Sequence, residues 1–128
     1  MQIRVPVSVG EVLDKITILQ IKLAQISDEA KRVNIQNELD ALLPLVTGDE
    51  FATDQMQGLM AELKAVNKAL WDIEDDIREK EAAKSFDAEF IRLARAVYVT
   101  NDKRAEIKKQ INLATGSALV EEKSYGSY

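Results

Sequence analysis

The chain has 128 residues, of which 30% are charged, and its formal net charge at pH 7 is −5. It contains no Cys and no His, which excludes disulfides, thiolate nucleophiles and the commonest ligands of zinc and haem. The net negative charge also argues against tight, non-specific binding to nucleic acid, which depends on clustered Lys and Arg side chains.

The length fits a single domain, residues 1–128, that can bury enough surface to fold without a metal ion. No apolar run approaches the roughly 18 residues of a membrane span, and neither end resembles an export or lipidation signal. We therefore expect a cytoplasmic protein without a membrane partner.

The chain opens with a short extended arm, residues 1–9, in which apolar and polar residues alternate. Pro6 is compatible with an arm or a sheet edge, because it cannot donate a backbone hydrogen bond. Ser8 and Glu11 then form the S-x-x-E capping box that marks the start of a helix. The first helix is predicted over residues 9–26.

This first helix is apolar on more than one side. Its main stripe consists of Val12, Ile16, Leu19, Leu23 and Ile26. Ile18 and Ile21 lie off that stripe, and we expect them to be exposed. A second apolar face predicts either a central position in a bundle or an interface with a second subunit, and it suggests a homodimer.

The second helix is predicted over residues 28–46, with an apolar stripe of Ile35, Leu39, Leu42 and Val46. Pro44 is expected to disturb its last turn. The third helix, residues 53–84, carries apolar residues in a heptad pattern typical of coiled coils. The heptad positions are Met56, Leu59, Leu63, Val66, Leu70, Ile73 and Ile77.

The fourth helix is predicted over residues 87–115, because Asp87 offers a cap at its start and Gly116 a stop at its end. Its stripe consists of Phe90, Leu93, Val97, Ile107 and Ile111. Residues 117–128 form a tail that either docks through Leu119, Val120 and Tyr125 or stays loose. The predicted fold class is all-α, a bundle of about four amphipathic helices or a pair of helical hairpins.

Polar residues occupy places where these helices normally carry core side chains. In the third helix, Asn67, Trp71, Glu74 and Arg78 follow one another at spacings of four, three and four, beside the heptad positions. In the fourth, Thr100, Asn101 and Arg104 interrupt the apolar stripe. A cross-helix pair between Glu74 and Arg104 or Arg95 is expected, and the start of the first helix could approach the same end. The candidate site is Glu11, Asp14, Lys15, Asn67, Trp71, Glu74, Arg78, Asn101 and Arg104.

The pattern leaves two functions open. Buried ion pairs and Asn residues often fix helix register without any ligand. This interpretation suits an interaction or oligomerisation module that forms a homodimer or binds another protein. The same cluster could instead bind an anionic sugar, a nucleotide-sugar or a phosphorylated metabolite, with Arg78, Arg95 and Arg104 holding the anion and Glu74 or Glu11 as base.

No cofactor is predicted, although carboxylates would suit Mg²⁺. The acidic run of the third helix resembles the ligands of helical Mg²⁺-dependent nucleotide pyrophosphohydrolases; it consists of Asp72, Glu74, Asp75, Asp76 and Glu79. Only Glu74 lies close to the apolar seam, so most of the run is expected to form a solvated face.

Five segments together resemble an uncharacterised bacterial family of short helical proteins, a domain of unknown function. They are Val5–Glu11 (VPVSVGE), Asp14–Leu19 (DKITIL), Asn67–Asp75, Tyr98–Asp102 (YVTND) and Glu121–Tyr125 (EEKSY). The resemblance covers nearly the whole chain and implies a discrete helical domain that occurs alone or near sugar-transfer and surface-polysaccharide enzymes. It implies no particular reaction.

Overall fold

The computed structural model describes residues 1–128, and all its regular secondary structure is helical, which confirms the predicted fold class. Its helices are α1 (Val9–Gln25), α2 (Glu29–Leu42), α3 (Asp54–Ala82) and α4 (Ala88–Thr115), with the 3₁₀ segments η1 (Leu43–Val46) and η2 (Asp49–Phe51) between α2 and α3. No helix is long and apolar enough to cross a membrane.

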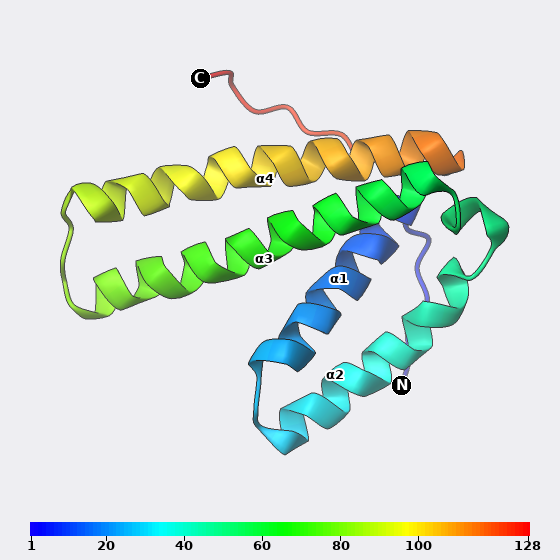
Figure 1. Ribbon diagram of the computed structural model, residues 1–128, viewed down its shortest axis with the longest axis horizontal. Helices are drawn as coiled ribbons and strands as arrows, with labels where there is room; N and C mark the ends of the chain where they lie inside the picture. Colours follow the sequence, from blue (N-terminus) through cyan, green and yellow to red (C-terminus); the bar gives the residue numbers. More distant parts are fainter.

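The helices form two hairpins of unequal length (Figure 1). Helices α3 and α4 lie side by side and antiparallel over their whole length. The shorter α1–α2 hairpin leaves this pair at a steep angle. Helix α1 therefore packs against α2 within its own hairpin, but it contacts α3 and α4 near one end of the long hairpin only. The opposite end of the long hairpin projects beyond the body of the molecule.

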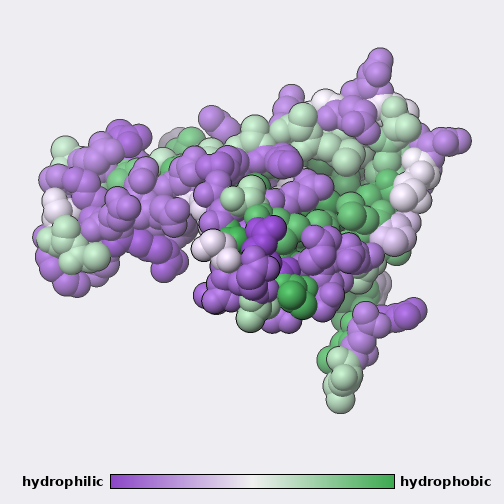
Figure 2. Space-filling view, turned by 60° about the horizontal axis from the view of Figure 1, so that its bottom comes forward, coloured by the Kyte–Doolittle hydropathy of each residue, from purple (hydrophilic) through white to green (hydrophobic).

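The core lies where all four helices and η2 meet. Its buried residues are Leu13, Ile16, Leu19, Ile35, Leu39, Phe51, Met56, Leu59, Leu63, Ile107 and Ile111. The first half of the predicted seam, from Met56 to Leu63, therefore belongs to this core. Its second half, Leu70 to Ile77, is only half-buried between α3 and α4. Figure 2 shows the same division, with a mostly hydrophilic surface on the projecting end of the hairpin.

Local capping explains why the helix boundaries were predictable to within two residues for three of the four helices. The side chains of Ser8, Thr53 and Asp87 accept hydrogen bonds from backbone N–H groups three residues on, at 3.2, 3.2 and 3.0 Å. Gly116 ends α4 with a left-handed φ of 63°. The second helix differs from the prediction, because the α-helix stops at Leu42 and the segment around Pro44 continues as the 3₁₀ helix η1.

Two expectations about exposed apolar groups are wrong. Ile21 is only 4% exposed and Ile18 is half-buried, because the second apolar side of α1 faces α3 where the two helices cross. The tail does dock on α4, but not through the predicted side chains, since Leu119, Val120 and Tyr125 are exposed. Its contacts with α4 are made instead by Glu121, Glu122 and Tyr128.

Candidate functional site

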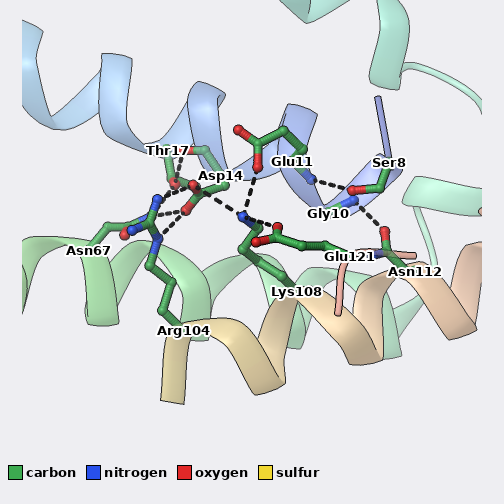
Figure 3. Close-up of polar contacts among 10 residues, drawn as sticks. All are labelled: Ser8, Gly10, Glu11, Asp14, Thr17, Asn67, Arg104, Lys108, Asn112 and Glu121. Carbon is green, nitrogen blue, oxygen red and sulfur yellow. Dashed lines mark hydrogen bonds and ion pairs between the residues drawn. The ribbon is translucent and has the colours of Figure 1, made fainter. Parts of the chain in front are cut away.

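A buried carboxylate, Asp14, holds α1 to the long hairpin (Figure 3). Its side chain is 1% exposed. Arg104 of α4 pairs with both carboxylate oxygens, with Nε 2.9 Å from Oδ1. Asn67 of α3 donates from Nδ2 to Asp14 Oδ1 and to the hydroxyl of Thr17, each at 2.9 Å. One carboxylate thus links three helices.

Lys108 extends this arrangement towards the start of α1 and the tail. Its ammonium group lies 2.7 Å from Glu11, 3.1 Å from Glu121 and 3.8 Å from the second oxygen of Asp14. We call the six side chains of Glu11, Asp14, Thr17, Asn67, Arg104 and Lys108 the Asp14 cluster. No fully buried side-chain nitrogen or oxygen in the structure lacks a hydrogen-bond partner, so every fully buried polar atom of the cluster is paired within the protein.

Three groups of the cluster, Asp14, Arg104 and Lys108, are held in their charged forms. Burial alone would raise the pKa of Asp14, but hydrogen bonds from Arg104 and Asn67 and the positive charges of Arg104 and Lys108 outweigh it and lower that pKa. The hydrogen bond with Asp14 raises the pKa of Arg104. Burial favours neutral Lys108, yet Glu11 and Glu121 raise its pKa overall. None of these groups is therefore poised to exchange a proton near neutral pH.

The first turn of α1 lies close against the end of α4. The backbone N–H of Gly10 donates to Asn112 Oδ1 at 2.7 Å, and that of Val9 donates to Ser117 Oγ at 3.1 Å. A Cβ atom on Gly10 would lie 2.7 Å from the carbonyl oxygen of Lys108, so only glycine permits this approach. Two orphan N–H groups of the α1 terminus are thus satisfied by side chains about a hundred residues away, at and just beyond the end of α4, whereas Ser8 satisfies that of Glu11.

Beside the cluster, where α1 diverges from α3 and α4, lies an open groove of about 460 Å³. We call it the Trp71 groove. Its lining consists of four apolar and six polar residues: Ile18, Ile21, Leu70 and Trp71, with Asn67, Glu74, Asp75, Arg78, Asn101 and Arg104. A volume of this size is typical of small-ligand sites.

Two groups on the wall of this groove have unused hydrogen-bonding capacity. The side-chain Nδ2 of Asn67 donates hydrogen bonds to Asp14 and Thr17, and its Oδ1 accepts no hydrogen bond from the protein. Arg104 uses one edge of its guanidinium on Asp14, and the rest of this side chain, which is 30% exposed, borders the groove. An acceptor and a donor therefore lie together beside the half-buried ring of Trp71.

The predicted site residues fall into three groups. Glu11, Asp14, Asn67 and Arg104 come together in the Asp14 cluster, and Trp71, Glu74, Arg78 and Asn101 join Asn67 and Arg104 around the groove. Lys15 belongs to neither, because it is exposed and lies 3.9 Å from Glu38 of α2.

The predicted pair of Glu74 with Arg104 or Arg95 is wrong. Glu74 pairs with Arg78 one turn along its own helix, at 3.2 Å, and Arg104 pairs with Asp14. Arg95 lies outside the groove and donates to the hydroxyl of Tyr98 at 3.4 Å. Helix α1 approaches α4 more closely than expected, and its buried carboxylate takes the guanidinium.

Sequence reasoning missed Gly10, Thr17, Lys108, Asn112 and Glu121. Lys108 and Asn112 follow Arg104 at intervals of four residues, so the same face of α4 carries all three. That spacing is visible in the sequence and could have extended the candidate site along the helix. Nothing local marks Glu121, whose role depends on the path of the tail.

No group of three or more Asp or Glu side chains lies where it could hold a metal ion. In the acidic run of α3, Asp72 pairs with Lys68 and Glu74 with Arg78, each within the helix. The resemblance to Mg²⁺-dependent pyrophosphohydrolases therefore finds no matching arrangement of ligands.

A family model described as "Family of unknown function (DUF6165)" matches residues 3–128. The chain belongs to this family. The match spans α1 to α4 and the tail, so the Asp14 cluster and the groove of this DUF6165 protein both lie inside the family domain. No curated protein and no solved structure matches the chain.

Proposed function

We propose that this protein is a small-ligand binding protein whose Trp71 groove takes an uncharged, hydroxyl-rich ring, such as a sugar. The observation that carries the proposal is the free acceptor of Asn67 and the free guanidinium edge of Arg104 beside the ring of Trp71. Sugar hydroxyls both donate and accept hydrogen bonds, and the apolar face of a sugar ring packs well on an aromatic side chain.

The charges of the groove favour an uncharged group at this place. Arg104 is neutralised by Asp14 and Arg78 by Glu74, while Asp75 adds a further negative charge. A phosphate or carboxylate here would compete with these pairs and gain little. The resemblance to bacterial proteins found near sugar-transfer enzymes supports the same ligand class. We propose that the protein binds this ligand in the cytoplasm.

The protein carries its own probe for the test, because Trp71 is its only tryptophan. We expect methyl glycosides and short oligosaccharides to change the fluorescence of Trp71 in a saturable way. Asn101→Ala, which removes one polar group from the groove, should weaken binding by about threefold to tenfold, the value of one hydrogen bond. Asn34→Ala, on the exposed face of α2, is the matched control and should have no effect.

A saturable signal that Asn101→Ala leaves unchanged would place the ligand elsewhere. The complete absence of a signal across the glycoside panel would refute the proposed ligand class.

A second candidate function is self-association through the N-terminal arm. Met1, Ile3, Val5 and Val7 are exposed by 42% or more, and the arm before Ser8 forms no hydrogen bond with the rest of the chain. An extended apolar segment with free backbone groups is suited to packing on a second copy. This arm, rather than Ile18 and Ile21, now supports the expected homodimer.

The test is sedimentation of the wild type and of Val5→Glu at the same concentrations. We expect a dimer for the wild type and a monomer for the variant, with equal helix content because Val5 is 66% exposed. A wild type that remains monomeric at high concentration would dispose of this second function.

A further inference from the structure

A second cleft adjoins the Trp71 groove along α4. It has a volume of about 570 Å³ and lies between α4 and the tail. Its lining includes Tyr98 and Asp102 of α4 and Lys123, Tyr125 and Tyr128 of the tail. Asn101 and Arg104 line both this cleft and the Trp71 groove, so one α4 face forms the wall that the two spaces share.

The cleft exists because the tail is held along α4 by specific contacts. Tyr128 donates a hydrogen bond to Asp102, and its ring packs edge-on against Tyr98 with the centroids 5.3 Å apart. Further back, Glu121 and Glu122 pair with Lys108 and Lys109 at 3.1 and 3.6 Å. The tail therefore supplies one wall of the cleft although it has no regular secondary structure.

The two spaces differ in charge. In the Trp71 groove both arginines have a carboxylate partner. In the cleft, Lys123 forms no ion pair and lies 5.9 Å from the ring centre of Tyr125, while Asp102 is engaged by the Tyr128 hydroxyl. Arg95, which contacts Tyr98, also has no carboxylate partner. An anionic group can thus be bound here without displacing an existing pair.

The aromatic groups differ as well. The cleft is bordered by three tyrosine rings, whereas the groove has one tryptophan. Exposed aromatic rings beside a cation provide a stacking surface for a planar base attached to a phosphate. The order along the shared face is therefore Trp71, then Asn101 and Arg104, then Lys123 and the tyrosines.

We infer that the cleft between α4 and the tail binds the phosphate and base of a ligand whose sugar lies in the Trp71 groove, so that the ligand is a nucleotide-linked sugar. This inference rests on the proposed function for the sugar end. Lys123 contacts the phosphates, and Tyr98 and Tyr125 stack on the base.

The experiment is calorimetric titration of the full chain with UDP-glucose, UDP-N-acetylglucosamine, dTDP-glucose and GDP-mannose, and with the corresponding free nucleotides and methyl glycosides. At least one nucleotide-linked sugar should bind at least tenfold more tightly than either of its parts. Lys123→Ala and Tyr125→Ala should each remove about tenfold of that affinity, as expected for a phosphate contact and a stacked base. Both side chains belong to the exposed tail, so neither variant should unfold the protein.

Lys31→Ala is the matched control, because Lys31 is an exposed lysine of α2 without an ion pair. The methyl glycosides should bind Lys123→Ala as they bind the wild type. The inference would be overturned if nucleotide-linked sugars bound no more tightly than methyl glycosides, or if their affinity were the same for Lys123→Ala and the wild type. Either result would leave the proposed sugar site unaffected. Nucleotides that bind through Lys123 while every glycoside fails would instead refute the proposed function of the Trp71 groove.

Discussion

The two ends of the α3–α4 hairpin are built from the same pair of helices but are stabilised differently. At one end, Leu63 and Ile111 are fully buried and the Asp14 cluster ties the hairpin to α1. At the projecting end, Leu93 is the one residue beyond Asn67 and before Ile107 that is buried, and the ion pairs are exposed ones such as Arg92 with Glu89. Polar groups thus stabilise this fold mainly where they are buried. Elsewhere they face water and their ion pairs contribute little to stability.

The largest effect is expected from Asp14→Asn. This change keeps the shape of the side chain but leaves Arg104 and Lys108 without their shared counter-charge. Because Arg104 remains partly exposed, we expect a loss near the lower limit for broken buried pairs, about 3 kcal/mol of unfolding free energy. Urea unfolding at pH 7 measures it.

Glu38→Gln is the matched control, because Glu38 forms an exposed pair with Lys15 and should change stability by less than about 0.5 kcal/mol. The difference between wild type and Asp14→Asn should also shrink in acid. The pKa of Asp14 is lowered by folding, so its contribution is present above the ordinary value of 3.8 and is lost as the pH falls through the folded value. An equal difference at pH 7 and pH 2 would contradict this role.

Two substitutions of glycine by alanine are expected to change the free energy of unfolding in opposite directions. Gly10→Ala would place a Cβ atom 2.7 Å from the Lys108 carbonyl oxygen, and it should cost about 1–3 kcal/mol as α1 and α4 are pushed apart. Gly58→Ala has open space around the new atom and lies within α3, so it should stabilise the protein by about 0.5–1 kcal/mol. Thermal and urea unfolding of both variants measure the two effects, and equal stabilities would show that the close approach is not required.

Hydrogen exchange should separate the two ends of α3 in the native protein. We expect the amides of residues 70–80 to exchange at least about tenfold faster than those of residues 59–67, a difference of about 1.4 kcal/mol in local opening. The reason is that residues 59–67 include the buried Leu59, Leu63 and Asn67, whereas no residue from 70 to 80 is buried. Uniform protection along α3 would show that the hairpin opens as one unit.

The smallest effect concerns Asp87, the cap of α4 at the projecting end. Its hydrogen bond from the backbone N–H of Phe90, together with Lys80, lowers its pKa to about 2. Folding therefore gains from this group above the ordinary value of 3.8 and loses that gain only as the pH approaches 2. An NMR titration of the carboxyl group measures it, and a midpoint near 4 would show that the cap is open in solution.

The fold was largely predictable because its signals are local. The helix starts at Ser8, Thr53 and Asp87 each depend on a cap within three residues, and the stop at Gly116 depends on one residue. The apolar stripes of α1 and α3 then place the core. Only the 3₁₀ turn around Pro44 needed information that periodicity does not contain.

The site was predictable only in part, because its contacts depend on how the helices cross. The spacing of Asn67, Trp71 and Asn101 places them on faces that meet, and the structure brings them to one groove. The partner of Arg104 was assigned to α3, since antiparallel neighbours are the obvious source of a carboxylate. The true partner, Asp14, comes from α1, and its burial at 1% exposure follows from a crossing angle that no local pattern encodes.

The contacts between the first turn of α1 and the end of α4 have a consequence for how the protein is made. They join residues 90 to 108 positions apart in the chain, such as Asp14 with Arg104 and Val9 with Ser117. Each of the two hairpins can form from neighbouring segments, but the contacts that close so large a loop form later and cost chain entropy. During synthesis, α1 therefore leaves the ribosome with Asp14 and no cation to pair with it. The core is completed only after Ile111 has emerged, and the contacts of the α1 terminus only after Ser117 has emerged, so most of the chain must be released before the native state forms.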